Sequence, residues 1–194
     1  LLADLPEGTR LEINLDRSVY IEASMMEVVK ALLIAMALVI AVIYLFLGNL
    51  RATLVPAVTI PVSIIAAFIV MGAMGFSINT LTLLGLVLAI GLVVDDAIVV
   101  LENIYRRMEN GEPALIASID GSREIGFAVV ATTMVLVAVF LPMSFLSGNV
   151  GKLFREFGFT IAAAVAFSSL VALTLTPMMT SKLFARGAHR SRMA

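Results

Sequence analysis

Five stretches of this chain are each apolar enough and long enough to cross a lipid bilayer as a helix. They cover approximately residues 28–47, 54–75, 78–101, 125–146 and 158–180. A hydrocarbon core of about 30 Å needs roughly 20 apolar residues. Within that core every backbone amide must find its partner inside the protein, which leaves helices or closed barrels. The sequence therefore predicts an all-α polytopic membrane protein with five transmembrane helices.

The composition agrees with this class and excludes several others. Hydrophobic residues make up 61% of the chain and charged residues 14%, whereas a soluble domain has about 25% charged residues. The net charge of −1 offers no basic face for nucleic acid, so we expect membrane lipid and no nucleic acid as a partner. Without cysteines there are no thiolate metal sites. We also find no pattern typical of an enzyme nucleophile, a phosphate loop or a metal site.

The two ends of the chain differ from the spans. Residues 11–16 alternate between apolar and polar side chains, which favours a half-buried strand. We interpret residues 1–24 as a β-strand stub at the end of a soluble domain; a disordered acidic tail is the alternative. Because the chain opens without Met or a basic leader, we expect it to be an excerpt of a longer protein. Residues 25–185 would form the helix bundle and residues 186–194 a basic tail.

The connection between the third and fourth spans is expected to be structured. The third helix can continue to Met108, and Pro113 suits the first position of a second, short helix. This helix, at about residues 113–120, would place apolar side chains on the cytoplasmic membrane surface: Leu115, Ile116 and Ile119. Ser122 is expected to cap the next span.

The distribution of basic residues predicts an orientation. If the first span runs inward, eight Lys and Arg residues lie on the cytoplasmic side and five on the outer side. Cytoplasmic connections carry an excess of such residues. We therefore expect the N-terminal end outside the cytoplasm and the C-terminus inside it.

Two adjacent carboxylates, Asp95 and Asp96, interrupt the third span. An Asp at the centre of a membrane helix costs about 2.5–3.5 kcal/mol on insertion scales, so two cost about 5–7 kcal/mol. Such a pair needs bound protons or polar neighbours, and its members should titrate as one coupled unit. It could take up a proton from one side of the membrane and release it to the other. The alternative is a hydrogen-bonding site that only fixes helix packing.

Small residues in the same span suggest how the pair is surrounded. Gly85 and Ala89 are spaced so that another helix can approach closely, and Gly91 thins the helix one turn before Asp95. We therefore expect both acids to face a tightly packed bundle interior. The hydroxyls of the fourth and fifth spans, such as Thr132 and Ser168, are expected mainly to serve packing.

Two sequence blocks resemble the fourth transmembrane helix of resistance–nodulation–division (RND) efflux pumps. They are Gly75–Thr82 and Gly91–Asn103, which includes the Gly-x-x-x-Asp signature. The likeness is closest to the hydrophobe/amphiphile branch of AcrB-like inner-membrane transporters. It implies that the spans are helices two to six of twelve, five of one six-helix half-repeat. It also implies that residues 1–24 end a periplasmic porter subdomain, in a protein of the bacterial inner membrane.

The resemblance also implies a function for the acids. Asp95 and Asp96 match the family's paired proton-carrying aspartates, which pair with a Lys and an Arg outside this sequence. The protein would then be a secondary transporter and no enzyme. It would export drugs and other amphiphilic compounds in exchange for protons, which act as the coupling ion without a cofactor or metal. The implied partners are small amphiphilic substrates, two further copies in a homotrimer, a periplasmic adaptor and an outer-membrane channel.

Several alternatives stay open on the sequence. Heavy-metal exporters of this superfamily usually carry one Asp followed by a small residue, so the doubled Asp favours drug export. Other members transport proteins or lipids, and a purely structural membrane domain is a further possibility. An intramembrane aspartyl protease needs its two acids on different helices, and no second span contains one.

Overall fold

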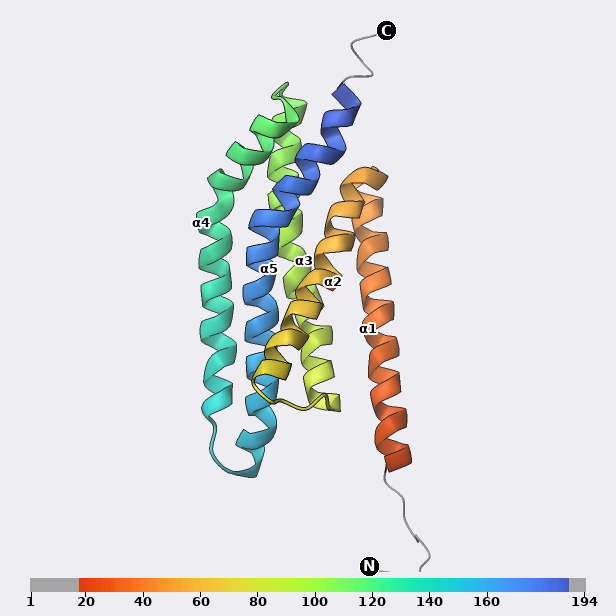
Figure 1. Ribbon diagram of the computed structural model, residues 1–194, viewed down its shortest axis with the longest axis vertical. Coiled ribbons are helices and arrows are strands. Elements are labelled where there is room, and N and C mark those ends of the chain that lie inside the picture. Colours follow the sequence, from red (N-terminus) through yellow and green to blue (C-terminus); the bar gives the residue numbers. More distant parts are fainter. Residues whose placement is uncertain (1–17, 189–194) are drawn as a thin grey trace, which may run out of the picture.

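The computed structural model describes residues 18–188 and contains five long helices in one bundle (Figure 1). The elements in chain order are α1 (Ser18–Leu47), α2 (Leu50–Ala73), α3 (Thr80–Glu109), α4 (Ala114–Phe140), the 3₁₀ turn η2 (Leu141–Phe145) and α5 (Gly148–Ala188). All five helices are long and apolar enough to cross a membrane. The predicted all-α polytopic fold is thus confirmed for the described residues. The expected strand at residues 11–16 and the last six residues of the basic tail, 189–194, lie outside them.

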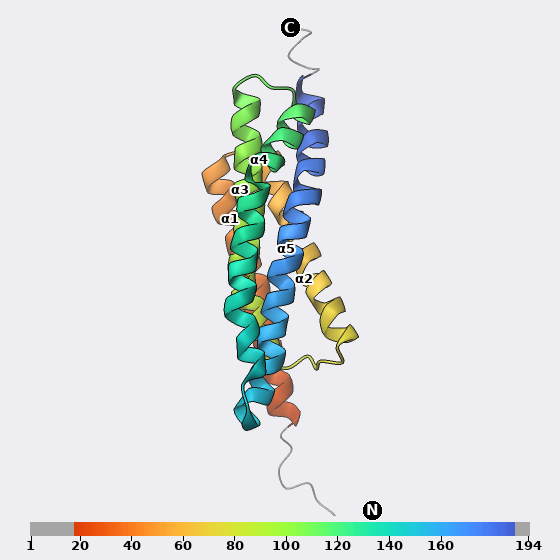
Figure 2. The same cartoon turned by 90° about the vertical axis from the view of Figure 1, so that its left-hand side faces the viewer.

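The helices are arranged around α3 and α5. Helix α3 contacts each of the other four helices, and α5 packs against α2, α3 and α4. Helix α1 contacts only α2 and α3 among the described elements. Figures 1 and 2 show α1 beginning and α5 ending at opposite ends of the bundle. Helices α1 and α4 are the least buried. Leu84, Leu88 and Val99 of α3 are exposed, so the other described helices leave one side of α3 uncovered.

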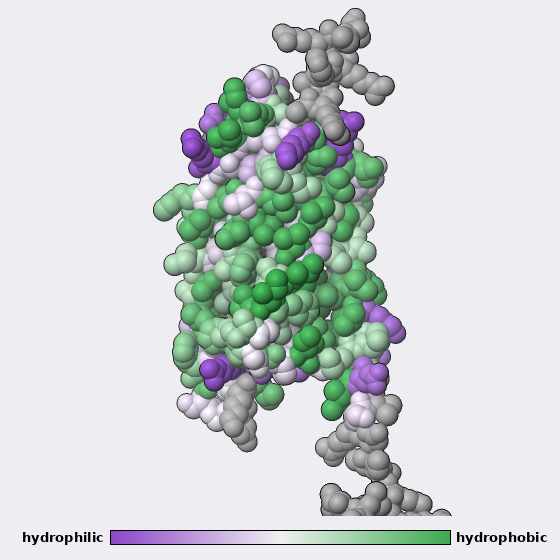
Figure 3. Space-filling view, in the orientation of Figure 1, coloured by the Kyte–Doolittle hydropathy of each residue, from purple (hydrophilic) through white to green (hydrophobic). Residues whose placement is uncertain are grey.

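Apolar and hydrophilic side chains are distributed over the surface as expected for a membrane protein. The face of the bundle seen in Figure 3 is apolar across its middle and carries hydrophilic side chains toward both ends. Exposed large apolar side chains occur on every helix, for example Leu45 on α1, Ile69 on α2 and Phe127 on α4. In water such a surface would be unfavourable, whereas lipid tails are an equally apolar medium.

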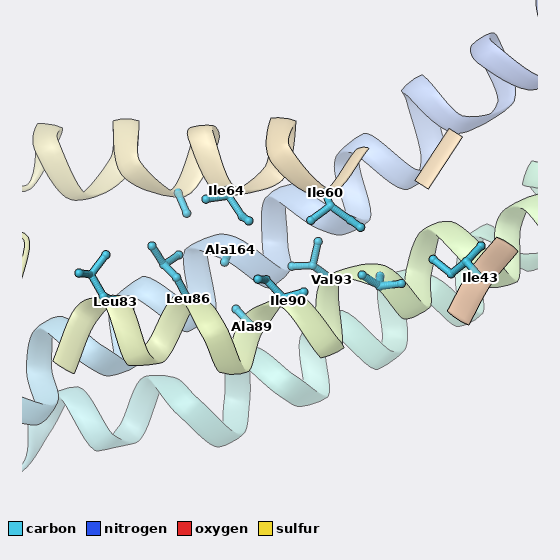
Figure 4. Close-up of a cluster of buried hydrophobic side chains, with 11 residues drawn as sticks. Ile43, Ile60, Ile64, Leu83, Leu86, Ala89, Ile90, Val93 and Ala164 are labelled. Atoms are coloured by element: carbon cyan, nitrogen blue, oxygen red, sulfur yellow. The ribbon is translucent and has the colours of Figure 1, made fainter. Parts of the chain in front are cut away.

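The main core lies where α1, α2 and α5 meet α3 (Figure 4). Ile60 of α2 and Leu86 of α3 are fully buried there, and Ile43 contributes from α1. Ala164 of α5 is also fully buried, and its small side chain lets α5 come close to α3.

Glycines in the left-handed backbone region end three of the helices. Gly48, Gly75 and Gly111 have φ values of +60°, +69° and +94°, which glycine adopts without a Cβ penalty. Asn79 then starts α3 with a capping box: its side chain accepts hydrogen bonds from the amides of Leu81 and Thr82, both at 2.9 Å. The short breaks in the sequence therefore act as sharp turns between antiparallel helices.

Three sequence expectations need correction. Residues 18–24, expected in the stub, form the beginning of α1. The surface helix expected at residues 113–120 is not a separate element but the first, slanted part of α4 (Figure 1). Ser122 does not cap a new helix, because its hydroxyl donates to Ile119 O within α4 at 3.0 Å.

Candidate functional site

Asp95 and Asp96 lie on α3 but point in different directions. Asp96 is half-buried and shares its face of the helix with the buried residues Gly85 and Ala89. Asp95 is exposed, as is Gly91 one turn before it. Neighbouring residues of a helix are about 100° apart, and contacts with α5 occupy the inward face. The expectation that both acids face the packed interior is therefore wrong for Asp95 within the described residues.

The surroundings of Asp96 are polar on the α5 side. Ser168 is buried, and its hydroxyl donates to Val93 O of α3 at 2.7 Å; the same hydroxyl lies near the Asp96 carboxyl group. Asp96 Oδ2 is buried and has no hydrogen-bond partner among the described residues. An unpaired buried carboxylate oxygen is unfavourable. This oxygen is thus suited to bind a proton, a water molecule or a cationic side chain.

A cavity of about 210 Å³ connects the two acids to α4. Its polar lining residues are Asp95, Asp96 and, across the cavity on α4, Thr132; the others are glycine or aliphatic, such as Leu92 and Leu136. The two acids therefore share one small space although their side chains diverge.

The small residues near the acids differ in what they contact. A Cβ atom on Gly85 would lie 3.1 Å from Phe157 Cδ2 of α5, so the glycine permits the close approach of that helix. Ala89 is buried in the core cluster between α3 and its neighbours. Apart from its chain neighbours and the backbone of its own helix, no atom of the described residues lies within 4 Å of a Cβ built on Gly91. Gly91 thus thins α3 on its uncovered side.

A polar cluster joins α3 to α4 at the end of the bundle where α3 ends and α4 begins. Asn103 is buried, and its Nδ2 donates to Gly121 O at 2.8 Å and to Glu124 Oε2 at 3.1 Å. Arg107 forms ion pairs with Glu112 at 3.1 Å and Glu124 at 3.2 Å. The hydrogen bond from Asn103, together with the nearby Arg107 guanidinium, lowers the pKa of Glu124. We call Asn103, Arg107, Glu112 and Glu124 the α3–α4 clasp.

The clasp was not predicted from the sequence, and Ser168 and Thr132 were expected mainly to serve packing. The spacing of Asn103, two helical turns after Asp96, was the available signal for the clasp. The contact of Ser168 with α3 joins residues far apart in the chain, which only the packing of α5 determines.

The fold and the site together define a polytopic membrane protein whose central helix carries a carboxylate pair. The sequence model of the AcrB/AcrD/AcrF family matches residues 1–193, and the chain belongs to this family. The resemblance to RND efflux pumps is thereby confirmed.

Curated relatives agree with this assignment. The chain is 50% identical over 192 residues to multidrug resistance protein MdtC of Pectobacterium atrosepticum, covering 99% of the chain and 19% of that protein. It is 50% identical over 183 residues to MdtC of Yersinia enterocolitica, covering 94% of the chain and 18% of the relative. The chain thus spans about a fifth of the length of the curated relatives it matches.

Proposed function

We propose that this chain is the proton-binding part of a transporter that exports drugs and other amphiphilic compounds in exchange for protons. The observation that carries the proposal is the position of Asp95 and Asp96 on the central apolar helix. Both acids line one cavity, and Asp96 Oδ2 is buried without a partner among the described residues. Structural packing alone would not need two carboxyl groups at such a cost. The similar proteins are named multidrug resistance proteins, which supports the export of drugs as the proposed activity.

The geometry suggests how protonation could move helices. When Asp96 is ionised, the Ser168 hydroxyl can donate to its carboxylate. When Asp96 is neutral, the hydroxyl can remain on Val93 O, where it lies at 2.7 Å, and the acid can donate instead. The two protonation states thus favour different contacts between α3 and α5, and a difference in contacts is what shifts a conformational equilibrium.

Asp95 needs a partner outside the described chain. It is exposed on the side of α3 that the other described helices leave uncovered, and an isolated carboxylate in lipid is unfavourable. We propose that basic side chains from another part of the complete protein cover this side. No cofactor enters the scheme, because protons are the coupling ion.

We propose the membrane location, the orientation and the assembly of the complete protein on the same grounds. The complete protein would lie in the bacterial inner membrane, with the start of α1 on the periplasmic side and the end of α5 in the cytoplasm. The excess of basic residues at the latter side supports this orientation. It would act as a homotrimer with a periplasmic adaptor and an outer-membrane channel.

Asparagine substitutions test the proposal. In the complete transporter, Asp95→Asn and Asp96→Asn should each abolish energised efflux of a fluorescent dye, because an amide cannot exchange a proton. The amount of protein in the membrane and its assembly should stay normal. Normal efflux from both variants would refute a proton-binding role.

A further inference from the structure

Thr132 lies on α4 across the cavity from the two acids. We propose that Thr132 Oγ1 is the third polar group of the site and holds a water molecule through which protons reach Asp95. The proposal rests on the proposed proton-binding function and adds a positioning residue to it. Helices α3 and α4 contact each other and both line the cavity, so the hydroxyl belongs to a different helix from the acids.

Among the described residues, no donor occupies the lone pairs of Thr132 Oγ1. Its hydroxyl donates to backbone carbonyls of its own helix, Val129 O at 2.9 Å and Ala128 O at 3.1 Å. A threonine hydroxyl has one proton and two acceptor positions. With its proton directed to the backbone, Thr132 Oγ1 acts toward the cavity as an acceptor.

The cavity has the size and the polar groups that water needs. Its volume of about 210 Å³ exceeds several times the roughly 30 Å³ that one water molecule occupies in the liquid. An ordered buried water makes two to four hydrogen bonds. One O–H of such a water can donate to a carboxylate on α3 and the other to Thr132 on α4. Without the Thr132 oxygen, the α4 wall of the cavity would be entirely apolar.

The acids are the titratable groups that line this cavity in the described part of the chain. From α4 the cavity receives the Thr132 hydroxyl, and from α5 the Ser168 hydroxyl approaches Asp96; neither carries a charge. Thr132 therefore acts through water on Asp95 and Asp96, without exchanging a proton of its own with solvent.

The neighbouring threonine provides a matched control. Thr133 has the same side chain and the same type of backbone bond, to Val129 O at 2.8 Å. It is buried and does not line the cavity. Valine has nearly the shape of threonine, so Thr132→Val and Thr133→Val each remove one hydroxyl at little cost in packing volume.

The test is proton-coupled efflux by the complete transporter. Thr132→Val should lower the rate roughly three- to tenfold, the loss expected for one hydrogen bond. Thr132→Ser should retain most of the rate, and Thr133→Val should behave like the parent. The infrared carbonyl band of the protonated acids should shift in Thr132→Val and stay in place in Thr133→Val. This band also reports the site if efflux by a variant is lost for another reason.

Several results would overturn the inference. The first is a parental efflux rate and an unshifted carbonyl band in Thr132→Val. The second is an equal loss of efflux and an equal band shift in Thr132→Val and Thr133→Val. The third is an efflux rate in Thr132→Ser as low as that in Thr132→Val. If the asparagine variants of the acids pump normally, the proposed function itself fails. If they do not pump while Thr132→Val does, only the role of Thr132 fails.

Discussion

Replacing Gly121 with alanine should destabilise the contact between α3 and α4. A Cβ atom there would lie 3.1 Å from Ile104 Cγ1 and 3.2 Å from Ile104 Cα. The second neighbour is backbone, so the helices would have to separate by a few tenths of an ångström. Overpacking of this kind costs about 1–3 kcal/mol. Separation also strains the 2.8 Å bond from Asn103 to Gly121 O, and a neutral hydrogen bond contributes about 0.5–1.5 kcal/mol.

Gly126→Ala is the matched control on the same helix. Among the described residues outside its own helix backbone, a Cβ at Gly126 would meet only Leu173 Cδ2, at an ordinary contact distance of 3.9 Å. Both alanines gain helix propensity of about 1 kcal/mol, which cancels when the two variants are compared. The remaining difference is about 1.5–4.5 kcal/mol.

The assay is the midpoint of thermal unfolding of the purified complete transporter in detergent. The Gly121→Ala midpoint should fall below those of the parent and of Gly126→Ala. A midpoint for Gly121→Ala equal to or above that of Gly126→Ala would mean that the two helices do not touch at Gly121.

Two further predictions concern the ends of α3. The pKa of Glu124 is lowered in the folded protein. At pH values above the ordinary glutamate pKa of about 4.3, the ionised Glu124 therefore stabilises the clasp. This contribution is lost as the pH falls through the folded pKa. Amide hydrogen exchange in residues 114–124, corrected for intrinsic rates, should therefore accelerate on acidification, and less so in Glu124→Gln; equal acceleration would contradict the prediction. At the other end, Asn79→Ala should cost about 0.5–2 kcal/mol through loss of the cap, measurable as a lower unfolding midpoint. Asn79→Ser should recover most of it, and an unchanged midpoint in Asn79→Ala would count against the capping box.

The sequence predicted the membrane spans well because lipid imposes a strong length and polarity requirement on each helix. It predicted helix ends less well. α1 begins at Ser18 instead of near Val28, and α5 runs on to Ala188 instead of ending near Thr180. Hydropathy marks the part of a helix that lies in lipid, whereas the backbone can stay helical beyond it until a residue such as Gly48 allows a turn.

The sequence indicated which residues make up the candidate site but not how they are arranged in space. The apolar surroundings of Asp95 and Asp96 identified the pair from sequence, because intramembrane acids are rare and costly. Which acid faces α5 depends on how α3 is rotated in the bundle, and a single sequence does not fix that rotation. For the same reason, the contact of Ser168 with α3 and the position of Thr132 on the cavity wall emerged only from the packing of α4 and α5.

The central claim is that Asp95 and Asp96 exchange protons, and infrared titration of the complete transporter tests it most directly. A carbonyl band of neutral carboxyl groups should grow as the pH is lowered, and part of it should disappear in Asp95→Asn and in Asp96→Asn. A spectrum whose pH dependence is identical in the parent and in both variants would contradict the claim.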